Sequence, residues 1–407
     1  MAGPLTHLKV LDLSRILAGP WASQVLADFG AEVIKVERPG KGDDTRHWGP
    51  PYLKDADGKD TADAAYYLSA NRGKKSITVD ITQPRGQALI KQLAAQCDIL
   101  LENYKVGGLE KYGLDYASIK AINPKIIYCS ITGFGQSGPY AKRAGYDAMI
   151  QGMGGLMSLT GVPEGQPGAG PQKVGVAVAD LMTGMYAVAG VLAAVIHRDR
   201  TGEGQQIDLA LLDTQVAWLA NQAQNYLTSG KSPERQGTAH PNIVPYQAVP
   251  ASDGYFMLAV GNDGQFKKFC EIAGLSELVE NPAYATNNAR VQARETLVPI
   301  VERATREHPA AWWLEKLSDA QVPCGPINNL EQVFADPQVQ ARGMVLEQEH
   351  PAAGKVKTVR NPLGFSASAL DYVQAPPTLG EHTDEVLADL LAMDADEIAA
   401  LKRDGVV

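Results

Sequence analysis

The sequence is poor in cysteine. Only four occur among 407 residues, at Cys97, Cys129, Cys270 and Cys324. None of them belongs to a C-x-x-C motif, and none has a histidine at the spacing of a zinc site. We therefore expect buried, reduced thiols, with neither a disulfide framework nor a bound metal.

Positive charge is also scarce. The chain has 37 Lys and Arg residues against 46 Asp and Glu residues, a formal net charge of −9. This balance argues against a nucleic-acid or anionic-membrane partner. The opening "MAGPLTHLKVLDLSR" lacks the basic segment and apolar run of a secretory signal. We expect a cytoplasmic protein with no nucleic-acid partner and no membrane partner.

Long apolar runs are missing except for one, "VGVAVADLMTGMYAVAGVLAAVI" at residues 174–196. This run is long enough to cross a bilayer. However, Asp180 lies inside it, and a carboxylate at membrane depth is costly. The sequence therefore favours a helix buried in the core of the protein.

The first 135 residues alternate between short apolar strands and amphipathic helices. Segments rich in Val and Ile occur at residues 10–14, 32–37, 75–81, 98–104 and 125–131. Such alternation predicts βαβ units on a mostly parallel sheet, in a Rossmann-like α/β domain. A loop rich in Pro and Gly at residues 229–246 then leads into a smaller α+β unit.

Residues 133–138, "GFGQSG", match the dinucleotide pattern G-x-G-x-x-G. A dinucleotide site requires these glycines between the first strand and a helix, with an acidic residue about 20 positions later. Here they follow the fifth predicted strand, and Pro139 and Tyr140 come next instead of a helix start. We therefore interpret them as a loop that passes close to a ligand or another backbone segment.

Asp180 is the only charged residue in its 23-residue apolar run. If the helix begins near Val178, this carboxylate lies in the first turn, where free backbone N–H groups stabilise an anion. One interpretation is a simple helix-start carboxylate. The other is a desolvated carboxylate that serves as a nucleophile or base. The residues alone leave both open.

Several segments in order resemble the class III CoA-transferases, the family of formyl-CoA transferase and carnitine CoA-transferase. They include "LDLSRILAGPWASQVLADFGAEVIKVERPGKGDDTR", "NRGKKSITVDI", "ENYKVGGLEKYGLDY", "ITGFGQSGPYAKRAGYDAMIQG" and "GVAVADLMTGMYAVAGVLAAVIHRDRTGEGQ". Further segments, among them "GTAHPNIVPYQA", are most similar to the succinate–hydroxymethylglutarate CoA-transferases of that family.

The resemblance implies a fold and an assembly. A large Rossmann-like, CoA-binding domain would comprise residues 1–228 and 330–407, and a small α+β domain residues 229–329. Two subunits would form an interlocked-ring homodimer. The co-substrate would be a coenzyme A thioester, with no permanently bound cofactor.

The resemblance also implies that Asp180 is the catalytic nucleophile. It would attack the acyl-CoA thioester and form an aspartyl mixed anhydride, while the CoA thiolate stays nearby. The thioester is then re-formed on the acceptor acid. An anhydride keeps the acyl group activated without ATP, and an apolar setting would protect it from water.

Matching family positions one at a time yields candidate CoA-binding residues. For each isolated Arg or Lys the alternative is an ordinary solvated surface charge. Arg143 stands beside Ala144, which occupies the place of a family lysine. The candidates are Arg15, Ile16, Leu17, Arg38, Val79, Asp80, Thr82, Asn103, Tyr104, Lys105, Lys111, Arg143, Tyr146 and Asp147.

The substrate candidates are Arg46, Arg72, Gly135 and His240. Formyl-CoA transferase has a glycine run where this chain has "GTAHPNIVPY", which argues against formyl or oxalyl substrates. His240 in this loop either binds a substrate carboxylate or packs structurally. Two arginines, Arg46 and Arg72, are candidates for a bidentate grip on a distal carboxylate. Gly135 is a candidate for lining the acyl site.

The expected reaction is reversible CoA transfer, with succinyl-CoA as donor and a dicarboxylate or related acid as acceptor. Glutarate, a hydroxymethylglutarate, itaconate and a sulfur analogue all remain open, because one methylene changes recognition by only about 1–3 kcal/mol. The alternative is an acyl-CoA racemase of the same fold. That reaction uses a histidine where this chain has Tyr146, a poor base near neutral pH.

Overall fold

The computed structural model describes residues 3–407, and the chain divides into two compact units. The first unit consists of Met1–Leu156, Lys173–Lys231 and Gln340–Val407, and the second of Met157–Gln172 and Ser232–Val339. Both ends of the chain thus contribute to the first unit. The second unit also includes residues 157–172 and 330–339, which the expected boundaries assigned to the large domain.

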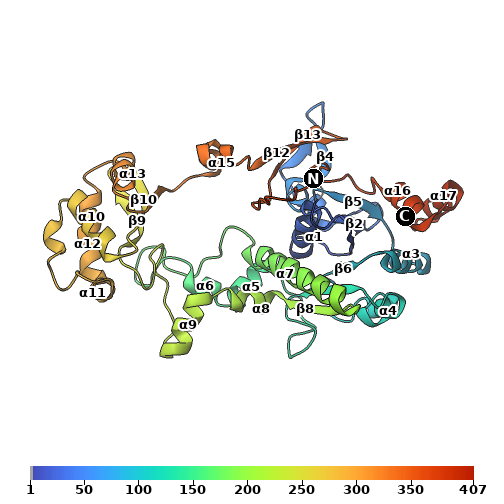
Figure 1. Ribbon diagram of the computed structural model, residues 1–407, viewed down its shortest axis with the longest axis horizontal. Coiled ribbons are helices and arrows are strands. Elements are labelled where there is room, and N and C mark those ends of the chain that lie inside the picture. The colour runs from blue at the N-terminus through green and yellow to red at the C-terminus, as the bar shows by residue number, and fades with distance from the viewer. Residues whose placement is uncertain (1–2) are drawn as a thin grey trace. The chain divides into compact units, whose positions relative to one another are not determined.

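The first unit is built on a six-stranded sheet whose neighbouring strands are all parallel (Figure 1). This confirms the predicted parallel α/β sheet. The strand order reverses between β1 and β6, and ligands of parallel sheets bind at the carboxyl ends of the strands at such a point. In spatial order the strands are β5 (Lys74–Thr78), β2 (Glu32–Glu37), β1 (Lys9–Asp12), β6 (Ile99–Glu102), β7 (Ile127–Thr132) and β8 (Gln206–Ala210).

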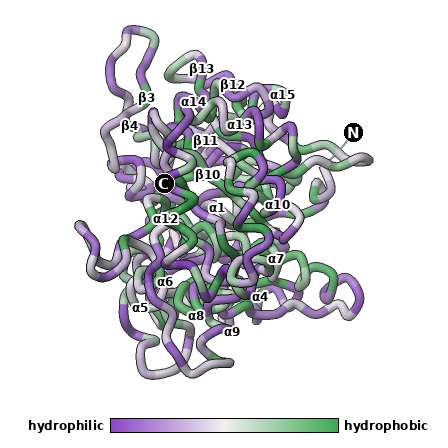
Figure 2. The backbone as a smooth tube through the Cα atoms, turned by 90° about the vertical axis from the view of Figure 1, so that its left-hand side faces the viewer, coloured by the Kyte–Doolittle hydropathy of each residue, from purple (hydrophilic) through white to green (hydrophobic). Residues whose placement is uncertain are grey.

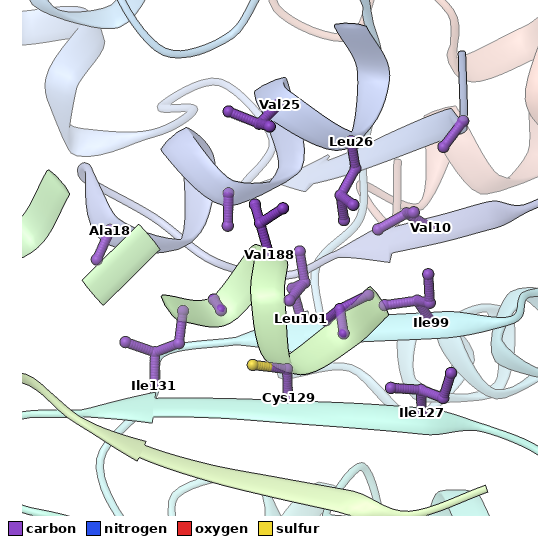
Figure 3. Packing of buried hydrophobic residues seen from close by; sticks show 14 of the residues in the cluster. Val10, Ala18, Val25, Leu26, Ile99, Leu101, Ile127, Cys129, Ile131 and Val188 are labelled. Atoms are coloured by element: carbon purple, nitrogen blue, oxygen red, sulfur yellow. The ribbon is translucent and has the colours of Figure 1, made fainter. Parts of the chain in front are cut away.

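Helices cover both faces of this sheet because successive strand residues point to opposite sides. On one face, Val10 and Leu101 pack in the same cluster as Val188, which lies on α7 (Figure 3). Leu11 and Leu100 belong to the cluster on the other face. The first face carries α1 (Ala18–Asp28) and α7 (Val178–Thr201). The second carries α3 (Pro84–Gln96), α4 (Tyr116–Ile122), α16 (Thr383–Leu391) and α17 (Ala395–Arg403).

The helix α7 is long and apolar enough to span a membrane by length and composition. Figure 2 shows hydrophobic residues in green along this helix. In the structure it packs against α1 and against the sheet. The prediction of a buried core helix is therefore confirmed for one side of α7 only, since Met185, Tyr186 and Ile196 on the same helix are exposed.

The remaining elements of the first unit are short. Two antiparallel hairpins, β3–β4 and β12–β13, lie outside the main sheet. All four cysteines are free, as expected, and three of them are fully buried. The further elements are η1 (Asp44–His47), β3 (Tyr52–Lys54), β4 (Asp60–Ala64), α2 (Ala65–Leu68), η2 (Glu110–Tyr112), α5 (Asp147–Met153), α6 (Leu156–Leu159, which reaches into the second unit), α8 (Leu211–Ala217), α9 (Ala220–Ser229), β12 (Val345–His350) and β13 (Gly354–Val359).

The second unit has its own antiparallel sheet and its own core. Its strands are ordered β11 (Cys324–Pro326), β10 (Gly254–Ala259) and β9 (Tyr246–Ala251). Phe256, Phe269 and Trp313 pack together at the centre of this core. Its helices are α10 (Asp263–Ile272), η3 (Ser276–Leu278), α11 (Asn287–Gln292), α12 (Arg294–Thr305), α13 (Ala310–Asp319) and α14 (Leu330–Ala335), and α15 (Pro337–Ala341) crosses its boundary.

Candidate functional site

A cavity of about 450 Å³ opens in the first unit near the carboxyl ends of its parallel strands. The segment after β1 contributes Arg15–Leu17, the segment after β6 contributes Asn103–Val106, and Gly133 follows β7. These segments meet because the strand order reverses between β1 and β6. The volume lies in the usual range for small-molecule sites.

Most of the predicted CoA-binding residues line this one cavity, together with Asp180. Asp147 does not line it but contacts the first turn of α7, as described below. The lining residues that the sequence predicted are Arg15, Ile16, Leu17, Arg38, Val79, Asp80, Thr82, Asn103, Tyr104, Lys105, Lys111, Arg143, Tyr146 and Asp180.

Four exposed cations line the cavity, namely Arg38, Lys105, Lys111 and Arg143. None of them forms an ion pair within 4.0 Å among residues 3–407. Unpaired cations beside a cavity are suited to an anionic ligand such as a phosphate ester. The arrangement therefore indicates a ligand with several negative charges.

Asp180 lies in the first turn of α7 and is partly buried. Burial raises the pKa of its carboxyl group to about 7, and the negative charge of Asp147 acts in the same direction. Burial and a like charge both disfavour the ionised form. The site therefore holds a carboxylate that is both desolvated and in contact with a ligand cavity.

Asp147 caps the helix that carries this carboxylate. Its Oδ1 accepts hydrogen bonds from the backbone N–H groups of Ala179, at 2.8 Å, and Asp180, at 3.4 Å. The α7 N-cap residue, Ala177, provides no side-chain cap of its own. The Asp147 carboxylate therefore satisfies N–H groups that would otherwise be unpaired at the helix start.

Gln151 completes this support. It is fully buried, and its Nε2 donates to Oδ2 of Asp147 at 2.7 Å. Its Oε1 accepts from the backbone N–H of Val174 at 3.0 Å. One side chain thus connects Asp147 to the segment that leads into α7, and both fix the position of Asp180.

The "GFGQSG" loop behaves as a close-approach loop. A Cβ atom on Gly133 would lie 2.7 Å from the Cα of Gly145, so two backbone segments cross where no side chain fits. Gly135 has a φ of +86° and lies outside the residues that line the cavity. The next helix, α5, begins only at Asp147. The interpretation of this loop as a close-approach loop is confirmed for Gly133.

The structure does not support Arg46 as a substrate residue. Its side chain is buried, and its Nε and Nη2 atoms donate to the two carboxylate oxygens of Glu37 at 2.8 and 2.7 Å. Its Nη1 pairs with Asp63, and its Nη2 also donates to the hydroxyl of Tyr67 at 2.6 Å. Because these partners occupy all three guanidinium nitrogens, none is left to bind a substrate carboxylate, and the expected substrate role is wrong.

The same correction applies to Arg72. It is buried, and its Nε and Nη2 atoms donate to the Asp28 carboxylate at 2.8 and 2.7 Å. Its Nη1 donates to the backbone oxygen of Val359 at 2.6 Å. Both arginines therefore join segments of the first unit, and neither lines the cavity.

His240 lies in the second unit, in the loop before β9. Its Nδ1 accepts a hydrogen bond from the backbone N–H of Asn242 at 3.1 Å, and its ring stacks on Tyr246. Burial and the charge of Arg294 lower the pKa of the imidazole. Because Nδ1 accepts this hydrogen bond, a neutral ring in this position carries its proton on Nε2. A contact with substrate remains a prediction for this residue.

Lys35, Asp43 and Tyr66 are among the residues near the cavity that the sequence prediction missed. Lys35 and Asp43 line the cavity yet are fully buried as an ion pair of 2.9 Å. The lysine inside the apolar strand "EVIKVE" was an available signal, because a charge in a buried strand needs a partner. The pKa of Tyr66 is raised to about 12 by burial and then by the negative charges of Asp180 and Asp147. No sequence pattern placed this phenol near the carboxylates.

Comparison with known proteins yields consistent matches. The sequence profile of CoA-transferase family III matches residues 5–383. The chain is 52% identical over 387 residues to succinate–glutarate CoA-transferase of Agrobacterium fabrum, covering 95% of this chain and 96% of that protein. It is 47% identical over 404 residues to human succinyl-CoA:glutarate CoA-transferase, covering 99% of this chain and 90% of that one. A crystal structure of a CAIB/BAIF family protein from Brucella suis matches with a TM-score of 0.84 at 52% identity, covering 96% of this chain and 100% of that one.

Proposed function

Because this chain is a CoA-transferase that belongs to CoA-transferase family III, we propose that it transfers CoA reversibly from succinyl-CoA to a dicarboxylate through an aspartyl anhydride at Asp180. The observation that carries this proposal is the partly buried Asp180 carboxylate lining the cavity of the first unit. The four unpaired cations beside the same cavity suit the phosphate groups of coenzyme A. The co-substrate is the CoA thioester, and the proposed chemistry uses no permanent cofactor.

Each step of the reaction exchanges one acyl bond for another. An Asp180 oxygen attacks the thioester carbonyl, the C–S bond breaks, and CoA leaves as its thiolate. The acceptor carboxylate then attacks the aspartyl carbonyl of the anhydride and releases succinate. Finally the thiolate attacks the acceptor's acyl carbon, which forms the new thioester and regenerates the Asp180 carboxylate. Water takes no part, so a desolvated site protects the anhydride.

Glutarate is the acceptor that we propose first. Two relatives that are 52% and 47% identical to this chain are named for succinate or succinyl-CoA together with glutarate. More distant relatives at 34–35% identity are named for citramalate, mesaconate and oxalate. All of these acceptors are small dicarboxylic acids, which supports the proposed substrate class.

The test is an acceptor panel. The enzyme is incubated with succinyl-CoA and one acid at a time, and the CoA thioesters are identified by mass spectrometry. We expect glutaryl-CoA to form faster than the thioesters of longer and shorter diacids and of butyrate, the matched monocarboxylate. Equal rates with butyrate would contradict a dicarboxylate specificity, and transfer to none of the acids would contradict the proposed function.

The charge of Asp147 predicts a specific pH profile. Only ionised Asp180 attacks the thioester, so kcat/KM is expected to rise with pH through about 7, the raised pKa of this group. Asp147→Asn removes the like charge but keeps an oxygen that can accept from Ala179. The apparent pKa should therefore move to lower pH, by up to about one unit.

The measurement is kcat/KM for succinyl-CoA in the wild type and in Asp147→Asn. The pH range is about 5 to 9, so that it brackets the raised pKa of Asp180 at about 7. Asp213→Asn is the matched control, because it removes an exposed carboxylate in the first turn of α8. We expect this control to retain the wild-type profile. An unchanged profile in Asp147→Asn would show that the charge of Asp147 does not act on Asp180.

We also propose a homodimer of the interlocked-ring type and a cytoplasmic location. Exposed large apolar side chains on three helices of the first unit support a second copy as the partner, because α7 packs against α8 and α8 against α9, and exposed apolar surface is buried favourably at an interface. Sedimentation of the purified protein should give twice the chain mass, and a monomer would contradict the proposal. The side chains are Met185, Tyr186 and Ile196 on α7, Val216 on α8, and Tyr226 and Leu227 on α9.

A further inference from the structure

The bend between β1 and α1 has a strained backbone at the cavity wall. Ile16 has a φ of +73°, in the left-handed region that favours glycine. A β-branched side chain is especially unfavourable there because of its steric bulk. Ile16 and Leu17 both line the cavity. The strain therefore lies where a ligand meets the backbone.

A buried ion pair contacts this bend at two points. The Nζ of Lys35 donates to the backbone oxygen of Ser14 at 3.0 Å, and the Asp43 carboxylate accepts from the backbone N–H of Ile16 at 3.2 and 3.3 Å. Lys35 and Asp43 are joined at 2.9 Å, and both are fully buried. The pair therefore holds the backbone on both sides of residue 15.

Asn103 holds the residue between these two contacts. Its Oδ1 accepts from the backbone N–H of Arg15 at 2.9 Å, and its Nδ2 donates to the backbone oxygen of Arg15 at 2.7 Å. Both polar atoms of this side chain are thus used by the bend. Asn103 was expected to contact CoA, and its observed partners point to a different role.

We propose that Lys35, Asp43 and Asn103 are positioning residues that hold the strained Ile16 bend in the conformation that binds the CoA thioester. This proposal rests on the proposed function. The three side chains come from different segments of the chain, yet all bind backbone atoms of residues 14–16. The folded protein already holds the bend in its strained conformation. Binding of the ligand therefore does not have to supply the free energy of distorting the bend.

The test is a double-variant cycle between Asp43→Asn and Ile16→Gly. Glycine adopts a φ of +73° without steric cost. With glycine at position 16, the bend should therefore no longer depend on the clamp, by which we mean the contacts from Lys35, Asp43 and Asn103. In the wild-type background we expect Asp43→Asn to lower kcat/KM for succinyl-CoA about tenfold or more, mainly through KM, since tenfold corresponds to about 1.4 kcal/mol. In the Ile16→Gly background, Asp43→Asn should lower kcat/KM by less than about threefold.

Two further variants keep this test decisive. Asp28→Asn breaks the pair with Arg72, which is equally buried and contacts no residue of the bend. The fold-change in kcat/KM that Asp28→Asn causes should be the same with Ile16 and with Gly at position 16. If Asp43→Asn does not fold, Asn103→Ala takes its place in the cycle, because it removes the contacts to Arg15 without leaving a charge unpaired.

The outcomes separate this proposal from the proposed function. The fold-loss in kcat/KM from Asp43→Asn or Asn103→Ala could instead be the same with Ile16 and with Gly at position 16. That result would overturn the clamp and would leave Asp43 and Asn103 as structural residues. If the wild type transfers no CoA to any acid, the proposed function fails. Calorimetric binding of coenzyme A to the same variants then still tests the clamp, with the dissociation constant in place of kcat/KM.

Discussion

Asp180→Asn is expected to lower the turnover number for CoA transfer at least about 1,000-fold, because the amide cannot form the covalent intermediate. The measurement is glutaryl-CoA formation from succinyl-CoA near pH 8, where the wild-type carboxyl is mostly ionised given its pKa of about 7. Wild-type enzyme treated with succinyl-CoA and hydroxylamine should carry a hydroxamate at Asp180, detectable by peptide mass spectrometry. The variant should carry none.

The same substitution should stabilise the fold, which separates a chemical defect from an unfolded protein. The folded-state pKa of Asp180 is raised from 3.8 to about 7, so the folded protein binds the extra proton between these values. Its stability therefore falls as pH rises through this window, and the loss is complete above about pH 7. We expect Asp180→Asn to gain on the order of 2 kcal/mol at pH 8, allowing for partial exposure. Residual transfer above about 10% of the wild-type rate would remove covalent catalysis at Asp180 from the mechanism.

Arg46→Met is expected to lower the free energy of unfolding by about 3–5 kcal/mol, because it leaves buried carboxylates without their cation. Glu37 and Asp63 are both buried and both pair with Arg46. Urea unfolding followed by circular dichroism measures this loss directly. A protein that cannot be obtained in folded form would agree with the expectation.

Arg143→Met is the matched comparison for this experiment. Arg143 is an exposed cation that lines the cavity and stacks on Phe134 and Tyr140. Its loss should change stability by less than about 1 kcal/mol and should raise KM for succinyl-CoA. A stable Arg46→Met protein with a raised KM for the acceptor acid alone would restore Arg46 as a substrate residue.

Local patterns were sufficient to predict the framework of the first unit. The apolar segments at residues 32–37 and 125–131 form β2 and β7 within one or two residues, because a strand buried on both faces requires a continuous apolar run. The apolar run around Asp180 begins its helix at Val178, as expected. Family resemblance then supplied the CoA-binding residues, most of which the fold brings to one cavity.

Partners distant in sequence were not predictable in this way. Arg46 and Arg143 are both arginines in polar segments, yet one is buried against Glu37 and Asp63 while the other is exposed beside the cavity. The cap that Asp147 provides to α7 joins residues more than thirty positions apart. Such pairings depend on how the chain crosses itself, which no local window contains.

The sequence by itself determined the order of strands and helices, the parallel sheet and the placement of Asp180 at a helix start. These features follow from hydrophobic period and helix-end chemistry, which act over a few residues. Only the tertiary structure decided which charged groups are structural, which remain free for a ligand, and what holds the strained bend at Ile16. The reason is physical: burial and pairing set the free energy of a charge, and both arise only when distant segments pack together.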